Sequence, residues 1–161
     1  MKIVIVGAGE VGRYVAKMLS NENHDITIMD ESEERLQDLD TNYDIMSRVG
    51  SPTSITDLQM CGVRNCDLFI AVNTSESVNT TACIIASKLG ARRTLARIDN
   101  YEYLLPKNKE MFKSLGIDKL IYPEVLAATE IVQALKRSWI REYRTISNEA
   151  LVLVRAKIRE N

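Results

Sequence analysis

Three glycines near the amino terminus have the spacing of a phosphate-binding loop. Gly7, Gly9 and Gly12 directly follow the apolar run of residues 3–6. Gly7 allows a sharp turn at the end of a buried strand, and Gly9 leaves the backbone open to a pyrophosphate. Gly12 lets the next helix pack closely, and the amide groups at the start of that helix face the phosphates. The pattern is short, so its surroundings decide whether it marks a nucleotide site.

An acidic residue at the end of a second strand-like run supplies that context. Residues 25–30 end in Asp30, which lies eighteen positions after Gly12. A carboxylate there accepts hydrogen bonds from both ribose hydroxyls of adenosine and repels a 2′-phosphate, which favours NAD over NADP. Two alternatives are that Asp30 caps a helix starting near Glu33 and that the glycines only mark turns. Strand, glycines, helix, strand and acid in this order predict a dinucleotide or adenine-nucleotide site.

Composition limits the class of protein. The chain has 161 residues, 45% of them hydrophobic, and a net charge of −1. This length suits one domain with a small appendage, and the balanced charge argues against an obligate nucleic-acid binder. The sequence lacks a run of about twenty apolar residues, and its first strand begins at residue 3, so we expect neither a membrane span nor a signal peptide. A cytoplasmic location is expected.

Cysteine and histidine offer little for catalysis or metal binding. Cys61, Cys66 and Cys83 lack the spacing of metal ligands, and the single histidine, His24, lies in a polar turn. We expect reduced structural thiols, no metal site and no catalytic residue.

Strand and helix patterns alternate at short intervals along the chain. This alternation predicts an α/β fold, a doubly wound, Rossmann-like parallel sheet of six strands with helices on both faces. The expected strands are 3–6, 25–30, 43–49, 67–72, 94–98 and 119–122. The expected helices are 10–21, 33–39, 54–60, 76–89, a polar helix containing Met111 and Phe112, and 123–137.

Several polar residues follow the ends of these strands, where ligands bind in open parallel sheets. We expect Asp30, Gly50, Ser51, Asn73, Thr74 and Arg97 to line one crevice together with the glycine loop. The guanidinium of Arg97 suits a phosphate or a carboxylate. A salt bridge from Arg97 to Asp99 or Glu102 is the alternative.

These motifs together resemble the regulator-of-potassium-conductance (RCK) domain, also called the TrkA-N domain. The resemblance covers residues 1 to about 140 and rests on several short motifs in a fixed order. They are Val6-Gly-Ala-Gly-Glu-Val-Gly12, Asp25-Ile-Thr-Ile-Met-Asp30, Val49-Gly50-Ser51, Ala71-Val-Asn-Thr-Ser-Glu-Ser-Val-Asn79, Ala96-Arg97-Ile98, Glu102-Tyr103 and Ile121-Tyr-Pro123-Glu124. Many dehydrogenases share the glycine loop, but the later motifs in this order are specific.

The resemblance implies a cytosolic regulatory subunit rather than an enzyme. Such domains bind NAD or NADH, or alternatively ATP or ADP, and gate a membrane potassium pathway. Carried over by motif, phosphate would contact Gly7, Ala8, Gly9, Glu10, Val11, Gly12 and Arg97, ribose would contact Asp30, and the adenosine side would be bordered by Ser51, Asn73 and Thr74. The wider family often has an acidic residue where Ser51 stands.

The resemblance also implies an assembly. Residues 1–122 would form the nucleotide-binding domain, and residues 123–140 a crossover helix that forms a homodimer, with larger rings typical of related gating assemblies. The partner would be an integral membrane potassium-translocating subunit at the inner face of the plasma membrane. The helix from Pro123 to about Arg137 does carry a broad apolar surface. Packing of this surface on the chain's own sheet is the alternative.

The last 21 residues predict the start of a second, truncated subdomain at 141–161. We expect Trp139, Ile140 and Tyr143 to extend the apolar surface beyond the helix. Residues 149–159 are a strand candidate without an expected partner, which is a liability in a finished domain. We therefore expect a longer regulator to continue after this segment. A fragment of an NAD-dependent dehydrogenase is the alternative function, and it requires an acid or base near the nicotinamide.

Overall fold

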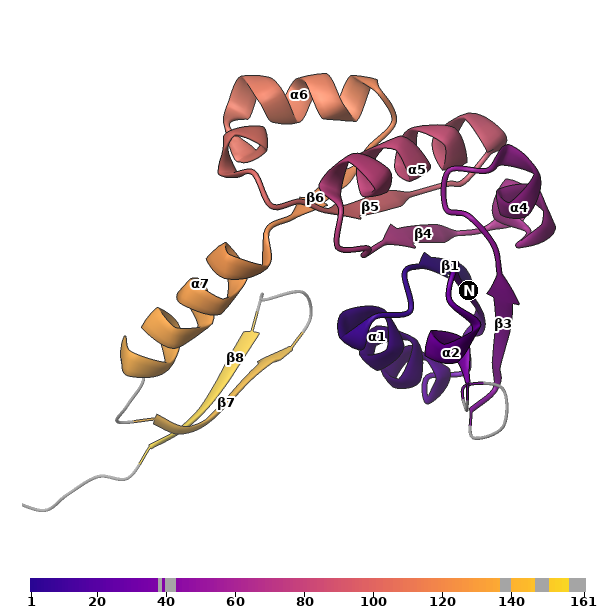
Figure 1. Cartoon of the computed structure of the whole chain (residues 1–161). Helices are drawn as coiled ribbons and strands as arrows, with labels where there is room; N and C mark the ends of the chain where they lie inside the picture. Colours follow the sequence, from indigo (N-terminus) through magenta and orange to yellow (C-terminus); the bar gives the residue numbers. More distant parts are fainter. Residues whose placement is uncertain (38, 40–42, 137–139, 147–150, 157–161) are drawn as a thin grey trace, which may run out of the picture. The chain divides into compact units, whose positions relative to one another are not determined.

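Strands and helices follow one another through most of the chain in a computed structural model, which describes residues 1–37, 39, 43–136, 140–146 and 151–156. The strands are β1 (Lys2–Val6), β2 (Asp25–Asp30), β3 (Ile45–Val49), β4 (Leu68–Ala71), β5 (Thr94–Arg97), β6 (Lys119–Ile121), β7 (Ile140–Ile146) and β8 (Leu151–Ala156). The helices are α1 (Glu10–Ser20), α2 (Glu33–Leu36), α4 (Ile55–Met60), α5 (Glu76–Leu89), α6 (Pro106–Ser114) and α7 (Pro123–Lys136), with short 3-10 turns η1 (Val63–Asn65) and η2 (Tyr101–Leu104). Contacts divide the chain into two compact units, Met1–Pro123 and Glu124–Asn161 (Figure 1).

The first unit contains a six-stranded sheet with the order β3-β2-β1-β4-β5-β6. Every neighbouring pair in this sheet is parallel. The order reverses between β1 and β4, which are hydrogen-bonded neighbours in the sheet although β2 and β3 separate them in sequence. This confirms the predicted doubly wound fold and places its ligand-binding switch point at the ends of β1 and β4.

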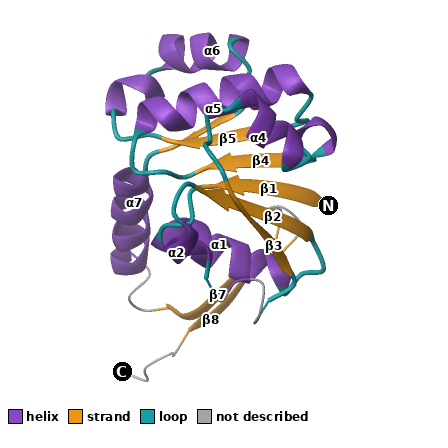
Figure 2. Ribbon diagram, turned by 45° about the vertical axis from the view of Figure 1, so that its right-hand side comes forward, coloured by secondary structure: helices purple, strands orange, loops and turns teal. Residues whose placement is uncertain are grey.

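Alternating side chains of β1 divide the interior into two layers. Ile3 and Ile5 belong to a cluster that includes residues of α1 and α2. Val4 and Val6 belong to the opposite cluster, with residues of α4, α5 and α6. Figure 2 shows α1 and α2 on one face of the sheet and α4 and α5 on the other. A strand that is buried on both faces needs a continuous apolar run, as residues 3–6 have.

Helix ends explain most of the predicted boundaries. The side chains of Ser54 and Ser75 accept hydrogen bonds at the starts of α4 and α5, and Gly90 ends α5 with a φ of 114°. The expected strand 43–49 begins at Ile45 rather than Tyr43, and α2 ends at Leu36 rather than residue 39. The other observed ends coincide with the predicted ones or differ from them by one residue.

The second unit corrects one prediction. The carboxyl-terminal strand was expected to lack a partner, but β8 pairs with β7 in an antiparallel hairpin. Ile140 and Tyr143 lie in β7, a strand that follows α7. Trp139 lies outside the described residues, as does Arg137 at the expected end of the helix.

Among the described helices, none has both the length and the apolar character that crossing a bilayer would require.

Candidate functional site

The glycine loop connects β1 to α1 at the carboxyl edge of the sheet. A side chain at Gly12 would collide with the carbonyl oxygen of Gly7. Gly7 itself has a φ of +102°, which favours glycine. A side chain at Gly9 would instead meet no atom within 4 Å. Gly12 therefore serves the packing of α1 against β1, whereas Gly9 opens the backbone toward the crevice, where a phosphate would approach.

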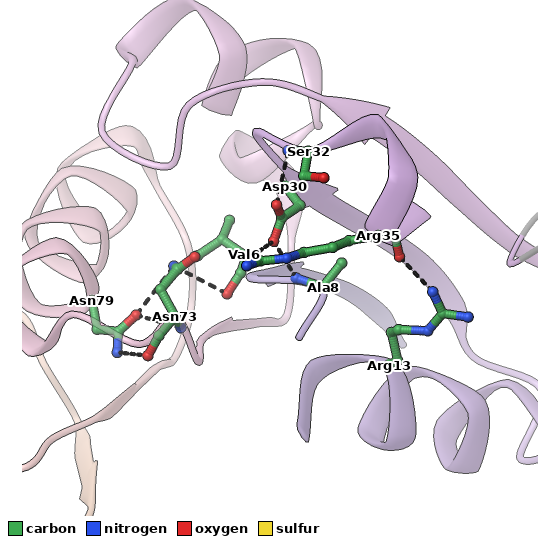
Figure 3. Close-up of polar contacts among 8 residues, drawn as sticks. All are labelled: Val6, Ala8, Arg13, Asp30, Ser32, Arg35, Asn73 and Asn79. Atoms are coloured by element: carbon green, nitrogen blue, oxygen red, sulfur yellow. Dashed lines mark hydrogen bonds and ion pairs between the residues drawn. The ribbon is translucent and has the colours of Figure 1, made fainter. Parts of the chain in front are cut away.

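Asp30 ties the end of β2 to the glycine loop. The main-chain amide of Ala8 donates a hydrogen bond of 2.7 Å to Asp30 Oδ2, and that of Ser32 donates one of 2.9 Å to Oδ1 (Figure 3). The residue is only 5% exposed. Ser32, not Asp30, is the N-cap of α2, so the capping alternative for Asp30 is wrong. A carboxylate has about four acceptor positions, so two remain for the hydroxyls of a ribose.

Arg35 brings a positive charge to Asp30. Its Nη1 lies 3.7 Å from Asp30 Oδ2, and its side chain is 57% exposed. Nη1 of Arg13 on α1 donates a hydrogen bond of 2.8 Å to the carbonyl oxygen of Arg35 (Figure 3). Because the guanidinium is exposed and lies beyond hydrogen-bond distance of the carboxylate, it has room to move when a ligand reaches Asp30.

The ends of β4 and β5 face the same crevice as the glycine loop. Asn73 follows β4, and its Nδ2 donates to the carbonyl oxygen of Val6 at the end of β1, over 3.4 Å. Arg97 ends β5, and its Nη2 lies 3.3 Å from Asp99 Oδ1. The predicted alternative for Arg97, a salt bridge to Asp99, is therefore present. Among the buried side-chain nitrogen and oxygen atoms of the described residues, Arg97 Nε alone has no hydrogen-bond partner.

Three cavities adjoin one another at this edge of the sheet. One of about 240 Å³ is lined by Gly7, Gly9, Glu10, Val11, Asp30, Arg35, Val72, Asn73, Thr74 and Arg97. A second, of about 420 Å³, is lined by Asp30, Glu31, Ser32, Arg35, Pro52, Thr53, Asn73, Thr74, Ser75 and Val78. A third, of about 570 Å³, is lined by Ala8, Gly9, Glu10, Arg13, Tyr14, Lys17, Arg35 and Thr74. Arg35 and Thr74 border all three, so the cavities are neighbours, and we refer to them together as the crevice.

Most of the predicted site residues line this crevice. They are Gly7, Ala8, Gly9, Glu10, Val11, Asp30, Asn73, Thr74 and Arg97. Gly12 is buried behind the loop, and Ser51 does not line any of the three cavities. The amide of Ser51 donates to Asp57 Oδ2 at 2.9 Å, and its neighbours Pro52 and Thr53 face the crevice instead.

Sequence reasoning missed Arg35 and Asn79. Arg35 lies in a run of charged residues that is typical of a solvated helix, and only its position beside Asp30 distinguishes it. Asn79 was part of a family motif without an assigned role, although its side chain is completely buried. A polar residue on the apolar face of α5 was the signal that could have identified it.

The histidine and the cysteines lie away from the crevice. His24 Nε2 is 3.6 Å from Glu22 Oε2 in the turn before β2, at the opposite edge of the sheet. All three cysteines are free and buried, as expected. Burial raises the pKa of Cys61 and Cys66 to about 11 and raises that of Cys83 as well. Among the described residues, no three His, Cys, Asp or Glu side chains are placed to hold a metal ion.

The sequence matches the model of one protein family. Residues 3–123 match the TrkA-N domain, which covers the six-stranded sheet and its helices.

Similar full-length proteins are potassium-uptake proteins. The Trk system potassium uptake protein TrkA of Haemophilus influenzae is 36% identical over 160 residues, which are 98% of this chain and 35% of that protein. A TrkA homolog from Methanothermobacter thermautotrophicus is 30% identical over 137 residues, 85% of this chain and 61% of that protein. The chain thus spans about a third of the length of the bacterial relative.

Solved structures share the fold at low sequence identity. The TrkA-N domain of the Escherichia coli inner membrane protein ybaL has a TM-score of 0.72 and 15% identity, over 83% of this chain and 96% of that one. The GsuK channel bound to NAD has a TM-score of 0.62 and 19% identity, over 91% and 25% of the two chains. GsuK bound to ADP has a TM-score of 0.61 and 20% identity, over 75% and 31%.

Proposed function

From the premise that this chain belongs to the TrkA-N domain family, we propose that it is the nucleotide-binding part of a regulator of potassium uptake. It binds an adenine nucleotide, NAD or NADH in the first instance and ATP or ADP as the alternative, in the crevice at the ends of β1 and β4. The nucleotide acts as a signal and leaves chemically unchanged.

The placement of Asp30 carries this proposal. Its buried carboxylate lies beside the glycine loop and keeps two acceptor positions for ribose hydroxyls. The backbone at Gly9 is open for a diphosphate, and Arg97, whose Nε has no hydrogen-bond partner, lines the same cavity. Asp30, the open backbone at Gly9 and Arg97 would thus meet the ribose and the diphosphate of one nucleotide.

The crevice suits a ligand without a 2′-phosphate. The negative charge of Asp30 would oppose a phosphate on the ribose, so NAD and NADH are favoured over their 2′-phosphorylated forms. Two similar structures are described as bound to NAD and to ADP, which share adenosine and diphosphate. Both ligand classes therefore fit the same set of contacts, and experiment has to choose between them.

Regulation requires that binding favours one arrangement of an assembly over another. We propose a homodimer formed through α7, which exposes the apolar side chains of Val125, Leu126, Ile131, Val132 and Leu135. A coupling free energy of about 1–3 kcal/mol means that the two arrangements of the assembly differ roughly 5- to 150-fold in their affinity for the nucleotide. Such a difference is enough to favour one state of a gated transport protein over the other. The partner is an integral membrane potassium-translocating subunit, and the chain lies on the cytoplasmic side of that membrane.

Thermal unfolding with separate additions of NAD, NADH, ATP and ADP tests nucleotide binding. A ligand at roughly a hundred times its dissociation constant adds about 2.7 kcal/mol to the unfolding free energy, so the preferred nucleotide raises the melting temperature. NADP and inorganic phosphate are the matched controls. No shift with any of the four nucleotides would contradict the proposal.

A dehydrogenase fragment is the competing function. Incubation of the chain with NAD and a panel of hydroxy acids and amino acids distinguishes the two, because a dehydrogenase produces NADH and a regulator does not. We expect the nucleotide to be recovered unchanged. Turnover of NAD that depends on chain and substrate would establish the enzyme instead.

A further inference from the structure

The side-chain amide of Asn79 lies directly behind the crevice and uses its full hydrogen-bonding capacity. Its Oδ1 accepts from the main-chain amide of Asn73 at 2.8 Å and from Asn73 Nδ2 at 3.2 Å. Its Nδ2 donates to the carbonyl oxygens of Asn73 and Arg97, each at 3.0 Å. An asparagine side chain has two donors and two acceptor positions, so all four are occupied.

These bonds connect three strands at the switch point of the sheet. Asn79 holds Asn73 after β4 and Arg97 at the end of β5, and Asn73 Nδ2 in turn donates to the carbonyl oxygen of Val6 at the end of β1. Figure 3 shows the two asparagine side chains facing each other beside the Val6 main chain. Asn79 itself is completely buried with all its donors and acceptors used, and a buried polar group satisfied in this way holds its partners in fixed positions.

Two further side chains of α5 hold β5 and the residues that follow it. Glu76, three residues before Asn79, accepts from the main-chain amides of Asp99 and Asn100 through Oε2, both at 2.9 Å. Cys83, four residues after Asn79, donates from Sγ to the carbonyl oxygen of Leu95 at 3.4 Å. Among these three α5 side chains, Asn79 is the one that contacts residues of the crevice.

Arg97 depends on such support. Its Nε has no hydrogen-bond partner, and its guanidinium has one ion pair, to Asp99. Its main chain is fixed by strand pairing and by the Asn79 amide. An arginine that binds phosphate through a fork of donors needs a well-placed backbone, because its own side chain is long and flexible.

We propose that Asn79 is a positioning residue for the phosphate part of the nucleotide: it fixes the main chain of Arg97, so that the Arg97 guanidinium meets the diphosphate. This inference rests on the proposed function. Packing of α5 on the sheet does not by itself require an amide, since Ala82, Cys83 and Ala86 bury the rest of that face without comparable networks. Asn79 does not contact Asp30, so its role concerns the phosphates and not the adenosine.

We therefore expect Asn79→Ala to lower the affinity for ADP more than the affinity for adenosine. We expect the affinity for ADP to fall at least about tenfold, because the substitution leaves the groups around Asn73 and Arg97 unpaired and mobile. The affinity for adenosine, measured by saturation-transfer NMR, changes less than about twofold, because adenosine relies on Asp30. Cys83→Ala, at a buried site on the same helix, is the control for loss of stability and changes neither affinity.

Two results would overturn the inference. One is a folded Asn79→Ala chain that keeps wild-type affinity for ADP, and the other is an equal loss of affinity for adenosine and ADP. If Asn79→Ala does not fold, Asn79→Ser, which keeps a hydroxyl at the site, takes its place. A wild-type chain that binds neither ligand overturns the proposed function, and this inference with it.

NMR of the wild-type chain supplies a measurement that does not depend on a variant. ADP should shift the Arg97 Nε–H resonance and the side-chain amide resonances of Asn79, because phosphate meets Arg97, whose main chain Asn79 holds. Adenosine should leave these resonances in place. Binding of ADP without any change at Arg97 and Asn79 would contradict the inference while leaving nucleotide binding established.

Discussion

Asp30 holds two segments of the chain by hydrogen bonds, and we propose that the same carboxylate also binds ribose. It holds the glycine loop through the Ala8 amide and the start of α2 through the Ser32 amide, and it faces the cavity where ribose would bind. The first function orients the second, because the hydrogen bonds fix the carboxylate plane before any ligand arrives. The sequence predicted the ligand function of Asp30 but not its hold on the loop.

Asp30→Ala should therefore weaken both binding and stability. Loss of charge-assisted hydrogen bonds to ribose, each worth about 1.5–3 kcal/mol, lowers ADP affinity by at least roughly tenfold. The buried Ala8 amide loses its acceptor, which costs about 1–3 kcal/mol in unfolding free energy. Calorimetric titration and denaturant unfolding measure the two effects. Asp25→Ala, at the exposed opposite end of β2, is the control, and unchanged ADP affinity in Asp30→Ala would refute the assigned role.

Because its thiols are buried, the chain should lose stability at alkaline pH. Burial raises the pKa of Cys61 and Cys66 from 9.0 to about 11 in the folded chain. Their contribution is complete below pH 9, where the thiols stay protonated in both states, and it is lost as pH rises toward 11. The unfolding free energy should fall over this interval. The double variant Cys61→Ala/Cys66→Ala should show a smaller fall, and an equal slope in both chains would contradict this assignment.

Arg35 and Asn79 show why some site residues escape prediction. Residue types and short spacings identify groups whose role is local, such as the glycines before α1. Arg35 acquires its role only when α2 places it beside Asp30, and Asn79 only when β5 lies next to β4. Both depend on contacts between distant parts of the sequence, which a single sequence does not specify residue by residue.

At the scale of elements, two glycines in the turn from β1 to α1 have different expected roles. Gly12 lets α1 pack against β1, and Gly9 leaves room for a phosphate. Gly12→Ala would force a side chain against the Gly7 carbonyl and should cost about 1–3 kcal/mol in unfolding free energy. Gly9→Ala meets open space and keeps an extended backbone, so its stability should change by less than about 0.5 kcal/mol. Its side chain would nevertheless obstruct the phosphate and reduce ADP binding. Thermal unfolding and titration of both variants check this, and a stable Gly12→Ala chain would contradict it.

The sequence pattern predicts some elements of the fold and misses others. The six parallel strands were predictable because their apolar runs alternate with capped helices. The β7–β8 hairpin was not, because residues 140–146 mix apolar and charged side chains and resemble a continuation of the helix surface more than a strand. A strand on a weakly alternating sequence is recognised only by its partner.

At the scale of the whole molecule, the assembly through α7 is open to direct test. The helix exposes Leu126 and Ile131 at 52% and 62%. Burial of such side chains drives association, so Leu126→Glu/Ile131→Glu should convert a wild-type dimer to a monomer in sedimentation experiments. Glu124→Gln, on the same helix, should leave the dimer intact. A wild-type chain that is monomeric at micromolar concentration would argue against this interface.

The chain spans about a third of the length of the related bacterial potassium-uptake protein. The step that we propose for this chain is the binding of a nucleotide at the carboxyl edge of its six-stranded sheet.

Hydrogen–deuterium exchange with and without ADP tests that step most directly. The account predicts slower exchange at the amides of Gly9–Val11, Ser32, Arg35 and Asn73–Ser75, which border the crevice. The cavity at the opposite edge of the sheet, lined in part by His24, Asp25 and Asp44, should show no change. Protection confined to that opposite edge, or unaltered exchange at the glycine loop under saturating ADP, would contradict the account.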